Sequence, residues 1–170
     1  MVYIRRAAPA DAVGICELHR SSIRRLCSAS YSPEQIASWT EALQPDRYLP
    51  AMERFEFFVA EAGGVVGFCI VDPNGGELNA LYVAPRSSGE GVGSALLEYA
   101  ERVAIAHSVA RLRVKSTVNA VTFYESHGFR QVRRALHVNP AGLELECVEM
   151  VKDLPRGSRV ADAEMESQSD

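Results

Sequence analysis

A strand-like apolar segment, a turn with three glycines and an amphipathic segment follow one another between residues 81 and 107. Gly89, Gly91 and Gly93 lack a Cβ, so the turn can bring successive backbone N–H groups toward one point. The helix that is expected to follow adds unpaired N–H groups and the positive end of its dipole. Such a turn is suited to hold an anion, and we therefore expect the chain to bind a phosphorylated ligand.

The length and composition of the chain predict one domain. Its 170 residues, 47% of them hydrophobic, support one sizeable core but not two. We predict a single domain over residues 1–154 and a disordered polar tail over residues 155–170, where the sequence offers little to bury. The formal net charge of -4 argues against a nucleic-acid partner, because such proteins usually present a basic face.

The four cysteines lie far apart, with no Cys-x-x-Cys pair and no histidine at ligand spacing. This pattern predicts neither a disulfide framework nor a metal site. No segment approaches the roughly 20 apolar residues that cross a bilayer, and the N-terminus has no apolar signal region. We therefore expect a cytoplasmic protein without a membrane partner.

Hydrophobic periodicity predicts a mixed α/β order. A strand at 2–6 precedes helices at 11–27 and from Pro33, and Ser32 and Gln35 form a capping box at the second helix. The remaining predicted elements are strands at 55–61, 65–72 and 77–83, a helix to about residue 107, a strand at 112–116, a helix at 120–127, and strands at 129–138 and 143–151.

This order resembles the GNAT superfamily of acetyl-CoA-dependent N-acetyltransferases. The resemblance spans nearly the whole predicted domain, and two blocks carry it: Leu-Tyr-Val-x-Pro…Gly-x-Gly-Val-Gly-Ser-Ala-Leu-Leu from Leu81, and Asn-Ala-Val-Thr-Phe-Tyr-Glu-Ser-His-Gly-Phe from Asn119. It implies the α/β GNAT fold, with a mixed central sheet of about seven strands, a splay between strands 4 and 5, and about four flanking helices. It also implies acetyl-CoA as cosubstrate, without a metal.

The resemblance assigns the cofactor-binding residues. Backbone N–H groups of the glycine turn would bind the pyrophosphate of coenzyme A, and the preceding strand would run along the pantetheine arm. The residues concerned are Leu81, Tyr82, Val83, Ser88, Gly89, Gly91, Val92, Gly93, Ser94 and Asn119. Asn119 either tethers the pantetheine arm or caps the helix after it. Ser88 stands where the family pattern often has glutamine or arginine, which predicts weaker affinity, and Glu90 would oppose the ligand unless it points outward.

Two catalytic residues are implied. Tyr124 is similar to the family tyrosine that protonates the departing thiolate, the alternative being a core tyrosine beside Phe123. Glu77 is the candidate base, because an alkylammonium acceptor with a pKa of about 10.4 must lose a proton before it attacks. By two-residue periodicity Glu77 shares a strand face with Leu81 and Val83. A solvated carboxylate, with a water chain as base, is an equally open interpretation.

The acceptor is expected to be a small-molecule or peptide primary amine that attacks acetyl-CoA directly in a ternary complex. Tyr31 and Trp39 are the candidate substrate-binding residues, because in this family the first helices wall the cleft opposite the coenzyme. The alternative for Trp39 is simple core packing. His19 and the other histidines are expected to be structural. A homodimer is left open, since dimers are common in the family.

Other protein classes fit less well. A Rossmann dinucleotide binder would have its glycines after the first strand and an acidic residue about 20 positions later, where this chain has arginines. A P-loop NTPase would need a lysine after Gly93. A non-catalytic GNAT-like module that binds coenzyme A or a protein partner as a sensor is the remaining alternative. Tyr124 and the intact glycine turn argue against it.

Overall fold

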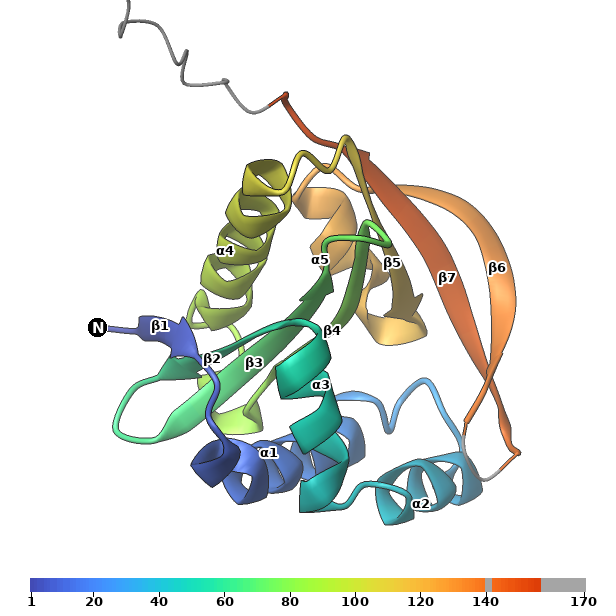
Figure 1. The fold of residues 1–170 in the computed structure, drawn as a ribbon. Helices are drawn as coiled ribbons and strands as arrows, with labels where there is room; N and C mark the ends of the chain where they lie inside the picture. The colour runs from blue at the N-terminus through green and yellow to red at the C-terminus, as the bar shows by residue number, and fades with distance from the viewer. Residues whose placement is uncertain (140–141, 157–170) are drawn as a thin grey trace, which may run out of the picture.

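Seven strands form one sheet in the computed structural model, which describes residues 1–139 and 142–156. The strand order is β1-β2-β3-β4-β5-β7-β6, with β4 and β5 parallel and every other neighbouring pair antiparallel (Figure 1). The strands are β1 (Tyr3–Arg6), β2 (Glu56–Glu61), β3 (Val65–Asp72), β4 (Glu77–Val83), β5 (Arg111–Thr117), β6 (Arg130–Val138) and β7 (Glu144–Asp153). The mixed α/β sheet predicted from the sequence is therefore confirmed, whereas the tail predicted from residue 155 lies, from residue 157 onward, outside the described residues.

Five α-helices flank the sheet, one more than the sequence predicted. They are α1 (Ala12–Leu26), α2 (Pro33–Glu41), α3 (Tyr48–Arg54), α4 (Val92–Ala106) and α5 (Val121–Ser126). The capping box of α2 is present as expected, since the Ser32 side chain accepts from the Gln35 N–H and the Gln35 side chain accepts in return. Helix α3 was not predicted, because seven residues with Pro50 in the first turn are too few to show a helical period.

The helices form one layer on each face of the sheet. In β2, Phe58 and Ala60 pack in one core with α4 and α5, while Phe57 and Val59 pack in a second core with α1, α2 and α3. Figure 1 shows α1, α2 and α3 gathered at the bottom of the view and α4 and α5 in its upper half. Successive side chains of β2 and β3 point to opposite faces of the sheet, and both faces are buried. This alternation separates the two cores.

The sheet splits between β4 and β5. Their parallel pairing consists of two residue pairs, Glu77 with Arg113 and Leu78 with Val114. Beyond these pairs β4 continues to Val83 along β3, and β5 continues to Thr117 along β7. The predicted splay is confirmed, and it leaves one edge of β4 without a neighbouring strand.

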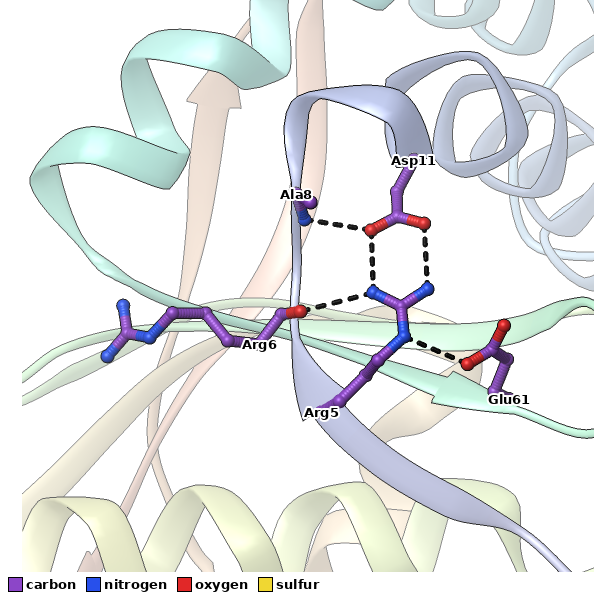
Figure 2. A network of polar contacts seen from close by, with 5 residues as sticks. All are labelled: Arg5, Arg6, Ala8, Asp11 and Glu61. Carbon is purple, nitrogen blue, oxygen red and sulfur yellow. Dashed lines mark hydrogen bonds and ion pairs between the residues drawn. The ribbon is translucent and has the colours of Figure 1, made fainter.

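A cluster of charged side chains anchors β1 to the start of α1 and to β2 (Figure 2). The Arg5 guanidinium donates two hydrogen bonds to Asp11, of 2.8 and 2.9 Å, and one of 2.8 Å to Glu61. The Ala8 N–H also donates to Asp11, at 2.8 Å. The hydrogen bonds from Arg5 lower the pKa of Asp11. This anchor fixes the first turn of α1, whose later residues reach the site described below.

Gly67 in β3 is a position where any side chain would overfill the core. A Cβ there would lie 2.8 Å from Leu96 Cδ1 and 3.1 Å from the Tyr82 carbonyl oxygen. We expect Gly67→Ala to lower the free energy of unfolding by about 1–3 kcal/mol in urea titrations. Gly14→Ala in α1, where nothing lies within 4 Å, should instead raise it by up to about 1 kcal/mol. A Gly67→Ala protein as stable as the parent would contradict this packing.

Candidate active site

Two cavities meet where β4 and β5 separate. The first, of about 530 Å³, lies between the end of β4, the glycine turn and the segment before α5, and we call it the turn cavity. The second, of about 410 Å³, lies between α1, α2, α3 and the middle strands, and we call it the aromatic cavity. Tyr82 and Thr117 line both cavities. A molecule in one cavity therefore lies close to a molecule in the other.

The glycine turn presents unpaired backbone donors. Among the described residues, five N–H groups between positions 89 and 94 have no backbone acceptor. They belong to Gly89, Gly91, Val92, Gly93 and Ser94. Between them the Glu90 N–H donates to the Ser87 carbonyl at 3.4 Å, and after Ser94 the Ala95 N–H donates to the Gly91 carbonyl at 3.0 Å. Gly89 and Gly91 have φ of 79° and 84°, a left-handed conformation that favours glycine. The turn and the first turn of α4 together form an anion-binding geometry.

The residues of the glycine turn do not all face the turn cavity. Ser88, Gly89, Gly91, Gly93 and Ser94 line it, as do Leu81, Tyr82, Val83 and Asn119. Val92 is buried in the core, so it can contribute only its backbone. Glu90 is exposed and is not among the cavity-lining residues, so its charge points away from the turn cavity. The N-cap position of α5 is Ala120, which makes the capping role considered for Asn119 wrong.

Ser94 is held by a histidine that the sequence did not single out. His127 Nδ1 lies 2.8 Å from the Phe123 carbonyl oxygen and Nε2 lies 2.9 Å from Ser94 Oγ. Because a carbonyl can only accept, Nδ1 carries the proton, and in the neutral ring Nε2 accepts from the Ser94 hydroxyl. The Ser94 hydroxyl proton is therefore engaged, and its backbone N–H is the donor that Ser94 offers to an anion.

The open edge of β4 presents two residues with their backbone polar groups unpaired by any strand. The Ala84 N–H donates to the Val66 carbonyl at 2.8 Å, so position 84 faces β3. By strand alternation the N–H and C=O groups of Val83 and Leu81 point the other way, toward the split. An extended chain with amide groups could pair with them as an added strand does.

A β-bulge places Glu77 on the face opposite to the one predicted. Ile70 pairs with Ala80 but Val71 pairs with Leu78, so Asn79 is an extra residue in β4. Leu78 consequently packs in the same core as Leu81 and Val83, and Glu77 lies on the other face with Ala80 and Tyr82. The expectation that Glu77 shares a face with Leu81 and Val83 is therefore wrong, because strict alternation cannot anticipate a bulge. Glu77 instead lines the aromatic cavity.

Tyr124 lies in the core between the sheet and α5. It is 5% exposed, contacts Phe123 and Phe129 edge-on, and lines neither cavity. Burial raises the pKa of Tyr124, so its phenol stays protonated in the neutral range. Burial likewise raises the pKa of Tyr82, and Tyr124 is one of the groups whose charge adds to that effect. Tyr82 lies at the junction of the two cavities.

The two predicted acceptor residues both line the aromatic cavity. Tyr31 is buried, and its hydroxyl donates to the Glu146 carbonyl at 2.6 Å and accepts from the Val118 N–H at 3.0 Å. It thus joins β7 to the end of β5. Trp39 is half-buried and meets the Tyr31 ring edge-on at 5.6 Å, so part of the indole faces the cavity.

Comparison with known proteins assigns the fold to a family. Residues 27–154 match the family described as the acetyltransferase (GNAT) domain. The chain belongs to the GNAT acetyltransferase family. This GNAT protein is 27% identical over 134 residues to the uncharacterized N-acetyltransferase YafP of Escherichia coli (strain K12), a match that covers 78% of this chain and 84% of YafP. Family and relative together make the chain an N-acetyltransferase.

Solved structures share the architecture. A GCN5-related N-acetyltransferase from Rhodopseudomonas palustris has a TM-score of 0.84 and 27% identity, covering 89% of this chain and 95% of its own. The PaiA N-acetyltransferase from Thermoplasma acidophilum, solved in complex with coenzyme A, has a TM-score of 0.71 and 24% identity, covering 90% and 99%. At 24% identity, the similarity to the PaiA protein shows a shared fold.

Over residues 1–139 and 142–156, no three His, Cys, Asp or Glu side chains are grouped so that they could hold a metal ion. Among the same residues, no helix is both long enough and apolar enough to cross a bilayer. The four cysteines are unpaired and buried.

His19, which was expected to be structural, lies in the wall of the aromatic cavity. Its Nδ1 is 2.9 Å from the Tyr48 hydroxyl, and its ring lies 4.1 Å from that of Tyr82, between centroids. Its Nε2 is buried and has no hydrogen-bond partner within the described residues. Tyr48 belongs to the unpredicted α3. The helical period placed His19 on the inner face of α1, but no sequence pattern indicated the missing partner.

Burial, with the nearby charge of Arg47, lowers the pKa of His19 to about 3. In the unfolded chain the pKa is about 6.5, so below that value the unfolded state binds a proton that the folded state does not. The free energy of unfolding should fall by about 2 kcal/mol between about pH 7 and about pH 5 from this residue. Urea titrations across this range measure the loss.

His19→Phe removes the titrating nitrogen and should flatten this dependence. His107→Phe at the exposed end of α4 is the matched control and should retain it. A parent protein whose stability is the same at both pH values, or a His19 resonance that titrates near pH 6.5, would contradict a neutral buried imidazole.

Proposed function

We propose that this GNAT protein transfers the acetyl group of acetyl-CoA to a primary amine, by direct attack in a ternary complex. The observation that carries the proposal is the junction of the two cavities at Tyr82 and Thr117. A thioester that reaches this junction from the turn cavity meets an amine that reaches it from the aromatic cavity. Holding both reactants together removes the need for an acetyl-enzyme intermediate.

Coenzyme A fits the turn cavity in three parts. Its pyrophosphate would accept hydrogen bonds from the five unpaired N–H groups between Gly89 and Ser94, which require no cationic side chain. Its pantetheine amides would pair with Leu81 and Val83 at the open edge of β4. Asn119 lies beside the same path and would contact the pantetheine arm. The PaiA protein, of the same fold, has been solved with coenzyme A bound.

The reaction requires three proton movements. The acceptor arrives as an ammonium ion and must lose a proton, and Glu77 in the aromatic cavity is the carboxylate placed to take it, directly or through water. The amine nitrogen then attacks the thioester carbonyl, a C–N bond forms, and the N–H of Leu81 would donate to the oxyanion. The C–S bond breaks, the thiolate takes a proton from Tyr124, and the nitrogen of the new amide gives up its surplus proton, which restores the Tyr124 phenol.

Tyr124 is suited to the role of acid by its protonation state. Because burial raises its pKa, the phenol keeps its proton wherever the enzyme is assayed near neutrality. A thiol has a pKa of about 8.5, so coenzyme A is already a fair leaving group and the acid accelerates departure without being indispensable.

Gly91→Ala tests the phosphate site. A side chain at a φ of 84° costs about 1–2 kcal/mol in the turn that aligns the donors. We expect the affinity for coenzyme A in calorimetric titrations to fall about tenfold. Gly63→Ala in the β2–β3 turn is the matched control, with a φ of 68° and nothing within 4 Å of the added Cβ. It should cost similar stability and leave the affinity unchanged; equal affinity loss in both variants would place the nucleotide elsewhere.

Turnover tests the chemistry. Release of free coenzyme A thiol from acetyl-CoA, in the presence of primary amines, should be measurable with the parent protein. Tyr124→Phe should lower kcat about 10²-fold with coenzyme A affinity retained, as expected for loss of a general acid. Glu77→Gln should lower kcat/KM most at low pH, where the acceptor is most fully protonated.

An unchanged kcat in Tyr124→Phe would remove this residue from the mechanism and leave the core tyrosine interpretation. No thiol release with any amine, together with tight binding of coenzyme A, would favour the non-catalytic sensor.

A further inference from the structure

The aromatic cavity constrains the acceptor more narrowly than the family does. Seven ring-bearing side chains line it: His19, Tyr31, Trp39, Tyr48, Phe68, Tyr82 and His137. Two groups of these rings are in contact. Phe68 and Tyr82 are stacked at 5.6 Å, and His19 lies 4.1 Å from Tyr82 and 5.3 Å from Phe68, between ring centroids. Tyr31 and Trp39 form a separate edge-to-face pair. A volume of about 410 Å³ is in the range of small-molecule sites.

We propose that the acceptor is a small monoamine carried on an aromatic body, which the aromatic cavity encloses while the amino group points to Tyr82 and Glu77. This inference rests on the proposed acetyl transfer and adds the substrate class. Aromatic rings prefer edge-to-face or offset contact with other rings, and the tilted rings of this cavity offer both kinds. A flat body would therefore gain more here than a flexible polar one.

The charges around the cavity favour an acceptor with one amino group over an acceptor with several. Among the described residues Glu77 has no ion-pair or side-chain hydrogen-bond partner, whereas Glu146 is paired with Arg134 at 2.6 Å. Lys115 and Arg47 also line the cavity. The unpaired Glu77 carboxylate can pair with one ammonium group of the acceptor. The positive charges of Lys115 and Arg47 repel the further ammonium groups of a polyamine or an aminoglycoside.

His19 supplies an independent sign of a ligand. Its side chain is nine-tenths buried and lines the cavity, yet Nε2 has no partner within the described residues. An unsatisfied buried polar atom of this kind costs stability that a ligand can recover. A hydroxyl group on the aromatic body can either donate to or accept from Nε2, so it suits both tautomers of the neutral imidazole.

The test is thiol release from acetyl-CoA with four amines: tyramine, 2-phenylethylamine, spermidine and an alanyl hexapeptide. We expect the two aromatic amines to give kcat/KM about tenfold or more above spermidine and the peptide. Tyramine should exceed 2-phenylethylamine in the parent protein but not in His19→Phe. Equal values in the parent would overturn the pairing with His19.

Trp39→Ala tests the wall directly. It should lower kcat/KM for the aromatic amines about tenfold while the KM for acetyl-CoA stays unchanged, which also shows that the variant is folded. Tyr3→Ala, an aromatic truncation at the 64% exposed Tyr3 in β1, is the matched control and should change neither value. Thiol release that is fastest with spermidine or the peptide would overturn the aromatic acceptor and leave acetyl transfer standing. No release with any amine would count against the transfer itself.

Discussion

The site depends on the short stretch over which β4 and β5 are hydrogen-bonded to each other. Parallel pairing between β4 and β5 stops after Leu78 and Val114, although both strands continue for several residues. Unpaired backbone groups in a protein interior are costly, so a split of this kind is stable only where water or a ligand reaches the exposed edge. Here the turn cavity runs along that edge, and the N–H and C=O groups of Leu81 and Val83 face into the split. The proposed binding of coenzyme A completes the sheet that the protein leaves open.

A single extra residue decides how the two halves of the site are divided. Without the bulge at Asn79, Glu77 would face α4 and α5 with Leu81, as simple alternation predicts. With it, Glu77 lies on the α1–α3 face, where it lines the aromatic cavity and not the turn cavity. The base candidate is then on the side from which an acceptor would arrive, and Tyr82 lies between the two cavities.

The sequence predicted the fold well, because its signals are local. The strands alternate cleanly, α2 has its capping box, and the glycine turn occurs between a strand and a helix, so seven strands and four of five helices follow from periodicity and turn chemistry. Helix α3 was not predicted because it is short and contains a proline.

The site was predicted less completely. The glycine turn is a contiguous motif, whereas the aromatic cavity joins His19, Tyr48 and Phe68 from three separate elements. The unsatisfied Nε2 of His19 is a property of packing that no sequence period contains.

The central claim is that acetyl-CoA lies along the open edge of β4 with its thioester at the junction of the two cavities. A crystal structure of the protein with coenzyme A tests this claim most directly. It should show the pyrophosphate within hydrogen-bond distance of the N–H groups between Gly89 and Ser94, the pantetheine amides paired with Leu81 and Val83, and the sulfur beside Tyr82 and Thr117. A nucleotide bound with its thiol away from Tyr82, or outside the turn cavity altogether, would contradict the account.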